Sequence, residues 1–203
     1  LRATLGVGPC QYILQTEGLA SDANPTPDSV MTFVEKQFSK KKEKKAADEI
    51  REMLAQMADH VEHAQKRIAR YGALGRDVRR LCQGQPAGSA AARAAESLRP
   101  SLDRLEESAG AVADGATQPA GQVRKLAGEV ASLIGKPDGA AECRRLGLEI
   151  RRLGALQDRA LANARMAARW MRQQAAAWPT QSPDVAGLAE KTQARIDQTL
   201  GNQ

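Results

Sequence analysis

Aromatic residues are scarce in this sequence: they make up 3% of 203 residues, with two each of Trp, Tyr and Phe. Much of the apolar content is alanine, which favours helices but buries little area per residue. The sequence therefore predicts a thin core. A carbohydrate-binding platform would need more aromatic residues, so we expect Trp170 and Trp178 to fill one end of a helical bundle.

Long hydrophobic runs are also missing. No apolar run approaches the roughly 18 residues that span a bilayer, so we expect no transmembrane segment. No basic-then-apolar start indicates a signal peptide. The chain starts at Leu1 rather than methionine, which suggests a processed product or a piece of a longer polypeptide. The absence of a signal peptide from this sequence therefore says nothing about the compartment, and the localisation stays open.

Cysteine and histidine are too rare for most sites built from them. Cys10, Cys82 and Cys143 are too few and too scattered for a disulfide framework or a paired CxxC metal site, and we expect buried thiols. His60 and His63 are the only histidines, and neither follows a Glu by three residues as in di-iron bundles. No histidine is placed to activate a cysteine nucleophile. The sequence thus predicts no catalytic residue, no metal and no cofactor, and it leaves the role of Cys10 open.

What the sequence does contain is an apolar stripe, a set of apolar or small residues spaced alternately four and three apart. In the first long stretch it comprises Ile50, Leu54, Met57, Val61, Ala64, Ile68, Tyr71, Gly75, Val78 and Cys82. An average step of 3.5 residues keeps such a stripe on one side of a supercoiled helix, whereas a strand alternates every two residues. We therefore expect a helix over about 46–82 that lies along other helices.

The second stretch, about 89–134, keeps this spacing but contains residues that oppose a smooth helix. Pro100, Gly115 and Pro119 fall within it, and an interior proline costs about 3 kcal/mol. We interpret the stretch as one bent, segmented helix that is weakest at 114–118. In the alternative interpretation it breaks into a hairpin, which gives four helices instead of three.

The third stretch covers about 139–177, and Gln157 is the single polar residue on its stripe. A polar residue at such a position can fix the register of a helical assembly. Three stretches of comparable length joined by short turns predict an antiparallel three-helix bundle. A disulfide between Cys82 and Cys143 would exclude this topology, because it places the two residues at opposite ends.

The predicted fold is all-α: an elongated antiparallel bundle of three long coiled-coil-like helices, with short flanking helices. Residues 1–26 are glycine-rich and then β-prone, which predicts an irregular or β-prone N-terminal arm or the tail of an upstream domain. Residues 27–178 form the bundle, which starts with a short helix capped by Thr26. Residues 179–203 form a short C-terminal helix and tail.

Basic residues exceed acidic ones by 30 to 24, a net charge of +6, and they concentrate in two clusters. The candidate contacts with an anion or a partner are Lys40, Lys41, Lys42, Lys44, Lys45, Arg144, Arg145, Arg151, Arg152, Arg159, Arg165 and Arg172. The arginines are expected to point outward in parallel columns, where they could pair with carboxylates or phosphates. The simpler interpretation of both clusters, which we favour, is a solvated charged surface.

The sustained stripe and the lack of any reactive constellation favour a non-catalytic structural or protein-interaction bundle. We expect a spacer or accessory module of a larger protein, and the high alanine and arginine content is typical of a bacterial source. The stripes could also pair two chains into a homo-oligomer. The alternative function is an anion-binding module that recognises nucleic acid or an anionic membrane surface through the two basic clusters. An enzyme ranks last.

Overall fold

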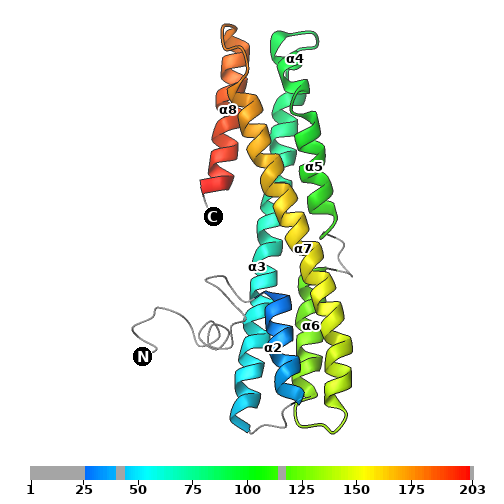
Figure 1. Cartoon of the computed structure of the whole chain (residues 1–203). Coiled ribbons are helices and arrows are strands. Elements are labelled where there is room, and N and C mark those ends of the chain that lie inside the picture. The colour runs from blue at the N-terminus through cyan, green and yellow to red at the C-terminus, as the bar shows by residue number, and fades with distance from the viewer. Residues whose placement is uncertain (1–25, 40–43, 114–117, 202–203) are drawn as a thin grey trace, which may run out of the picture. The chain divides into compact units, whose positions relative to one another are not determined.

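The computed structural model describes residues 26–39, 44–113 and 118–201, and all regular structure in these ranges is helical (Figure 1). The helices are α2 (Pro27–Ser39), α3 (Lys44–Gln83), α4 (Ala90–Glu96), α5 (Arg99–Gly110), α6 (Pro119–Ser132), α7 (Gly139–Ala176) and α8 (Pro183–Gly201). The prediction of an all-α protein is confirmed. Apart from Thr26, the predicted N-terminal arm lies outside the described residues.

The chain divides into two compact units, and the two longest helices contribute to both. Unit 1 comprises Leu1–Gln65 and Ala116–Asp158, so it contains α2, α6 and the first parts of α3 and α7. Unit 2 comprises Lys66–Gly115 and Arg159–Gln203, so it contains α4, α5, α8 and the remainders of α3 and α7.

The prolines of the second stretch mark where new helices begin. Pro100 lies in the first turn of α5, and Pro119 lies in the first turn of α6. Proline is tolerated there because the first backbone N–H groups of a helix have no partner within the helix. Ala120, next to Pro119, donates its backbone N–H to Oε1 of Gln65 on α3 at 3.1 Å, so a neighbouring helix caps α6. The predicted weak point lies outside the described residues, except for Gln118.

The start of α2 follows the sequence prediction. Thr26 Oγ1 accepts the backbone N–H of Ser29 at 3.2 Å, and Ser29 Oγ accepts the backbone N–H of Thr26 at 3.1 Å. This reciprocal pair satisfies N–H groups that the helix itself leaves unpaired. Thr26 is therefore the N-cap of α2.

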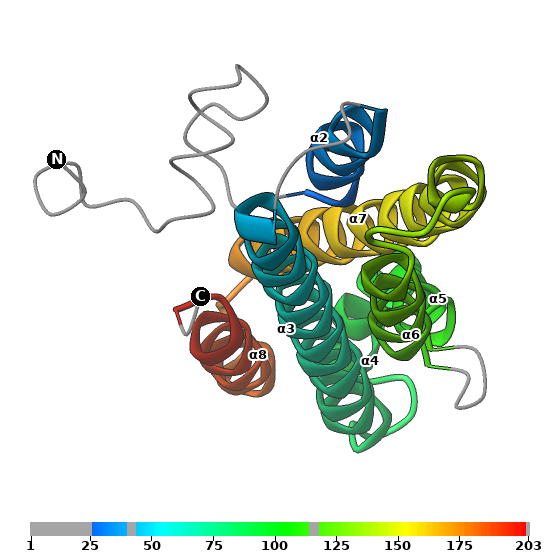
Figure 2. The ribbon, with the colours of Figure 1, turned by 90° about the horizontal axis from the view of Figure 1, so that it is seen from below.

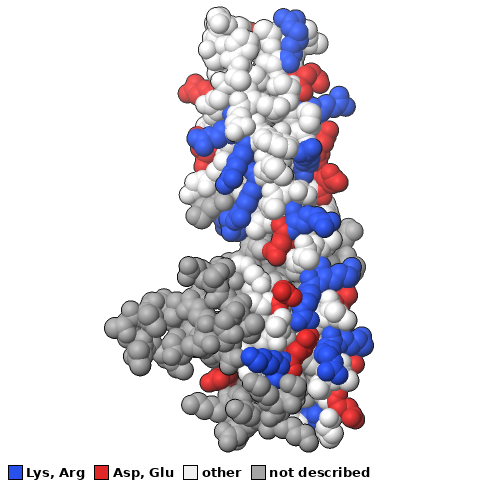
Figure 3. Space-filling model, in the orientation of Figure 1, with Lys and Arg blue, Asp and Glu red and all other residues white. Residues whose placement is uncertain are grey.

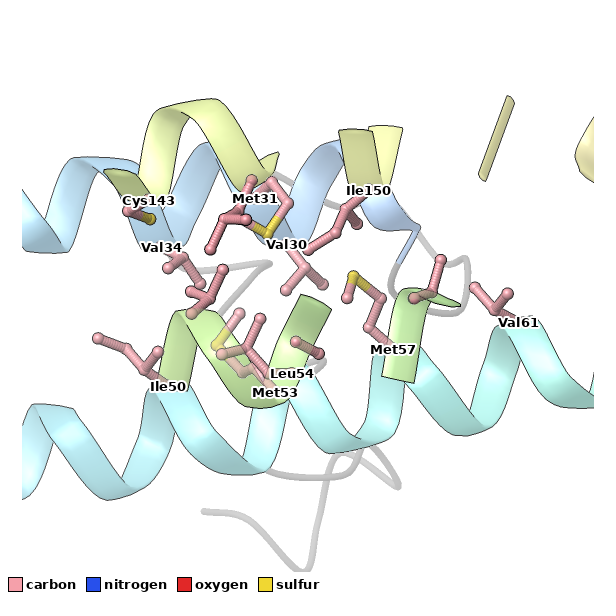
Figure 4. Packing of buried hydrophobic residues seen from close by; sticks show 14 of the residues in the cluster. Val30, Met31, Val34, Ile50, Met53, Leu54, Met57, Val61, Cys143 and Ile150 are labelled. Atoms are coloured by element: carbon pink, nitrogen blue, oxygen red, sulfur yellow. The ribbon is translucent and has the colours of Figure 1, made fainter. Parts of the chain in front are cut away.

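The core of unit 1 is built from large side chains of four helices (Figure 4). Its fully buried members include Val30, Met31 and Val34 of α2, Met57 of α3, Val123 and Val130 of α6, and Cys143 and Ile150 of α7. In the close-up the side chains of α2, α3 and α7 point toward one another across the core. Burial of this apolar area is the main term that holds α2 and α6 against the two long helices.

The core of unit 2 contains more alanine. Its buried side chains include Ile68, Tyr71 and Val78 of α3, Leu98 before α5, Leu105 of α5, Ala164, Ala167, Ala168 and Met171 of α7, and Val185 and Ile196 of α8. Trp178 closes α7; it is buried, and its indole N–H donates to Ser97 Oγ at 3.0 Å. Alanine lets helices approach closely but buries less area per residue than Met, Leu or Ile.

Glycines allow one close helix approach in each unit. In unit 1, a Cβ on Gly154 would lie 2.5 Å from Cγ of Pro27, where α2 lies beside α7 (Figure 2). In unit 2, a Cβ on Gly72 of α3 would lie 2.6 Å from Cβ of Ala109 on α5. Only glycine fits at these two positions without a shift of the neighbouring helix.

Gln157 is buried in unit 1, with 1% of its surface exposed. Its side-chain amide donates to the backbone carbonyl of Val61 on α3, whereas its Oε1 accepts no hydrogen bond from the described residues. The sequence correctly predicted that this residue lies on a buried stripe. An unsatisfied buried oxygen is costly, so this one polar contact favours a single alignment of α7 against α3.

Candidate interaction surface

The structure describes only part of the first basic cluster predicted from the sequence, and it describes all of the second. Lys40, Lys41 and Lys42 lie outside the described residues, and Lys44 and Lys45 lie in the first turn of α3. The seven arginines of the second cluster all lie on α7. The surface in Figure 3 shows basic and acidic side chains interspersed rather than separated by sign.

Three of the seven arginines pair with acids at the molecular surface. Arg145 and Arg152 reach the glutamates three residues before them on α7, each at 2.6 Å. The hydrogen bond from Arg145 lowers the pKa of Glu142, and that from Arg152 lowers the pKa of Glu149. Arg172 pairs with Asp197 of α8 at 3.2 Å. These pairs reduce the positive charge that α7 offers to an external anion.

Arg151 does not point outward as expected. Its side chain is 23% exposed and faces α2, where Nη1 donates to Oε1 of Glu35 at 2.7 Å and Nε donates to Oδ1 of Asp28 at 2.9 Å. The hydrogen bond with Glu35 raises the pKa of Arg151. A Cβ on Gly147 would lie 2.5 Å from Oε1 of Glu35, so Gly147 and Gly154 let α2 approach α7 closely enough for these acids to reach Arg151. Arg151 therefore joins two helices of unit 1.

The other three arginines have no acidic partner among the residues that the structure describes. Arg144 and Arg159 are exposed. Arg165 is half-buried, and its Nε atom is buried without a hydrogen-bond partner in the described part of the chain. Only these three members of the predicted cluster are left for an external anion.

All large hydrophobic side chains that are exposed in the described ranges belong to α7. They are Leu148, at 67% exposed, and Leu156, Met166 and Trp170, at 43%, 44% and 40%. We expected both tryptophans to be packed at one end of the helices; Trp178 is buried, whereas Trp170 is exposed and does not fit this expectation. The sequence contained a signal for this difference, because Trp170 immediately precedes Met171, which lies on the buried stripe.

Trp170 lies beside a surface hollow in unit 2. The guanidinium carbon of Arg104 on α5 lies 4.7 Å from the centroid of the indole, a cation–π contact that holds the ring in place. The hollow is lined by Pro100, Ser101, Arg104, Trp170, Gln173 and Gln174. The Ser101 hydroxyl donates a hydrogen bond to Oε1 of Gln174 at 3.2 Å. This bond uses the amide oxygen of Gln174, so the amide N–H groups can donate to other acceptors.

The two histidines lie on α3 next to Asp59 and Glu62, whose carboxylates form ion pairs with an arginine of α6. Arg124 of α6 donates to Asp59 at 2.7 Å and to Glu62 at 2.6 Å, both on α3. The Nδ1 atom of His63 lies 2.8 Å from the backbone oxygen of Asp59. Within the described ranges, no three His, Cys, Asp or Glu side chains are grouped as metal ligands would be.

Neither described cysteine is set up as a nucleophile. Cys143 is fully buried, and its burial raises the pKa of the thiol to about 11. Burial also raises the pKa of Cys82, which is partly exposed. The thiolate is the reactive form, so both sites disfavour it near neutral pH. The two thiols are free, and Cys10 lies outside the described residues.

Comparison of the chain with protein-family models, with curated proteins and with solved structures found no match. In the described part of the chain, every helix is too short or too polar to cross a membrane.

Proposed function

We propose that this chain is a non-catalytic structural and protein-interaction bundle, a spacer or accessory module of a larger bacterial protein, and that α7 contacts the partner. The observation that carries the proposal is the restriction of exposed large hydrophobic residues to α7 within the described ranges. Single exposed apolar residues are normal on a soluble protein. Their concentration on one helix is typical of a contact surface.

The partner surface is expected to be apolar and acidic. Arg144, Arg159 and Arg169 are exposed on α7 and make no ion pair with a described residue. Arginine pairs bidentately with carboxylates, so acidic side chains on the partner would complement these groups while apolar ones cover Trp170 and Met166.

The test compares binding by the wild-type chain with binding by the double variant Met166→Ser/Trp170→Ser. Proteins retained from an extract of the source cells by the wild type are identified and then purified. We expect direct binding of one such protein to be at least about tenfold weaker for the double variant, because exposed aromatic residues dominate interface energies. Lys191→Ser on the exposed side of α8 is the control and should bind normally. Equal binding by the wild type and the double variant would refute the role of α7.

The proposed architecture is an elongated antiparallel bundle with coiled-coil-like packing along its stripes. It is supported by the burial of the striped residues of α3 from Ile50 to Val78 and of those of α7 from Cys143 to Met171. The 40 residues of α3 would extend over about 60 Å at the rise of an α-helix. Small-angle scattering tests this through the maximum dimension, and sedimentation tests whether the stripes or α7 pair two copies of the chain.

The second candidate is the anion-binding module predicted from the sequence. It is favoured by the absence of an acidic partner for Arg144, Arg159 and Arg165 within the described residues. Retention on heparin that falls steeply with salt would support binding to nucleic acid or an anionic surface. Failure to bind heparin at low salt would remove this candidate.

A further inference from the structure

Unit 2 contains a group of arginines that are contributed by three helices. This unit 2 arginine cluster comprises Arg67 and Arg70 of α3, Arg165 of α7 and Arg195 of α8. Arg67, Arg70 and Leu74 share one side of α3, because residues three and four apart in a helix are neighbours. The cluster shares only Arg165 with the basic residues predicted from the sequence.

Two members of the cluster repel each other. Burial lowers the pKa of Arg67, and the nearby charge of Arg165 lowers it further. Arg165 is half-buried, and its Nε atom has no hydrogen-bond partner in the part of the chain that the structure describes. A buried guanidinium N–H without an acceptor is costly, and a second positive charge nearby adds to the cost. An anion at this position would remove both penalties.

The cluster continues into a surface hollow between α3 and α8. The hollow has a volume of about 360 Å³ and is lined by Arg70, Ala73, Leu74, Asp77, Arg195, Gln198 and Thr199. Its one acidic side chain, Asp77, lies 3.6 Å from Arg80. Arg70 and Arg195 are exposed and make no ion pair with a described residue. The hollow therefore carries an excess of positive charge and presents guanidinium and amide donors.

We propose that the unit 2 arginine cluster binds an anion that contains two or more linked phosphate groups. Each guanidinium presents a fork of N–H donors that matches the oxygens of a phosphate group. One phosphate would take the position beside Arg165, and a linked phosphate would lie in the hollow beside Arg195. Asp77, the acidic residue that lines the hollow, pairs with Arg80, and Asp197 of α8 pairs with Arg172. This site goes beyond the proposed interaction with a protein partner and does not depend on it.

The test uses inorganic tripolyphosphate as the probe, with the whole chain at fixed ionic strength and pH. Isothermal titration calorimetry of the wild type should show saturable binding at one equivalent. Arg165→Gln should weaken binding at least about tenfold, because a charge-assisted hydrogen bond contributes more binding free energy than a hydrogen bond between neutral groups. Arg99→Gln removes the same charge from an exposed position of unit 2 that does not line the hollow, and it should leave the affinity within about twofold, as expected of a charge screened by solvent.

Arg195→Gln tests the second part of the site and keeps the proposal open to refutation if Arg165→Gln does not fold, because Arg195 is exposed. It should lower the affinity for tripolyphosphate but not that for monophosphate. Citrate at equal charge should bind more weakly than tripolyphosphate if linked phosphates are the ligand class. No binding by the wild type, equal losses in Arg99→Gln and Arg165→Gln, or equal affinity for monophosphate and tripolyphosphate would overturn the proposal.

Discussion

In each unit a short helix packs against a long one at glycine residues, and an arginine forms ion pairs between the two helices. In unit 1 the long helix is α7. Gly147 and Gly154 leave space for α2, and Arg151 binds Glu35 and Asp28. The glycines set how close the two backbones come, and the arginine then reaches acids that a wider spacing would leave in water.

In unit 2 the long helix is α3. Gly72 and Gly75 leave room for α5, and Arg79 donates to Asp103 and Glu106, each at 2.7 Å. The two units therefore use one kind of helix junction. The units differ in their cores, because the core of unit 1 consists mainly of large side chains and that of unit 2 contains more alanine.

The two cores predict different stabilities. A core of Met, Val, Ile and Phe side chains buries more area per residue than one that contains more alanine, so we expect unit 1 to be the more stable of the two. Exposed large hydrophobic residues do not distinguish the units, because Leu148 and Leu156 belong to unit 1 and Met166 and Trp170 belong to unit 2. The anion site that we propose lies within unit 2.

Removal of a buried methionine should destabilise each unit locally. Met57 in unit 1 and Met171 in unit 2 are both 0% exposed, and replacement by alanine typically costs about 2–5 kcal/mol. Amide hydrogen exchange should rise mostly in α2 and α6 for Met57→Ala and mostly in α5 and α8 for Met171→Ala. Exchange that rises equally in all helices for both variants would show one cooperative unit instead of two.

A methyl group at the glycine junctions should destabilise the chain because the contacting atoms have little freedom to move. A Cβ at Gly154 meets the ring of Pro27, and one at Gly72 meets Cβ of Ala109. We expect Gly154→Ala and Gly72→Ala each to lower the free energy of unfolding by about 1–3 kcal/mol in urea titrations. Gly128→Ala is the matched control, because nothing lies within 4 Å of its Cβ, and it should raise stability by about 0.5–1 kcal/mol. A loss of stability in the control would contradict this explanation.

Two adjacent arginines of α7 should differ in their effect on stability. Arg151→Met breaks the contacts with α2 and leaves two acids without their partner, which should cost about 1–2 kcal/mol, since the pair is only partly screened by solvent. Arg152→Met removes an exposed pair within one helix and should produce no measurable change in the urea midpoint. Equal urea midpoints for the two variants would show that the contacts of Arg151 with α2 do not stabilise the junction.

The sequence predicted the helices well because burial repeats with the helical period. Ile50, Met57 and Ile68 of α3 are all buried, as the spacing indicates. Gln157 is buried for the same reason. The division of the chain into two units has no comparable signal, because α3 and α7 continue through both without a change of period.

The sequence was less informative about the surface. Arg151 and Arg152 are neighbours of the same type, and only the position of α2 decides that one is half-buried and the other exposed. The same limit applies to the unit 2 arginine cluster, whose members come from three helices that are far apart in the sequence. A glycine within a helix does not by itself identify a junction either, since Gly128 lies within α6 but meets open space.

The smallest effect at neutral pH is expected for the ionisation of Cys143. Burial raises the pKa of this thiol to about 11, whereas the unfolded chain ionises it near pH 8.5. Unfolding therefore releases a proton above that pH, and stability falls by up to about 1.4 kcal/mol per pH unit as the pH approaches 11. Cys143→Ala lacks this proton, so its stability deficit relative to the wild type should be constant near pH 7 and should shrink at higher pH. A deficit that stays constant up to pH 11 would mean that the folded protein lets the thiol ionise as freely as the unfolded chain does.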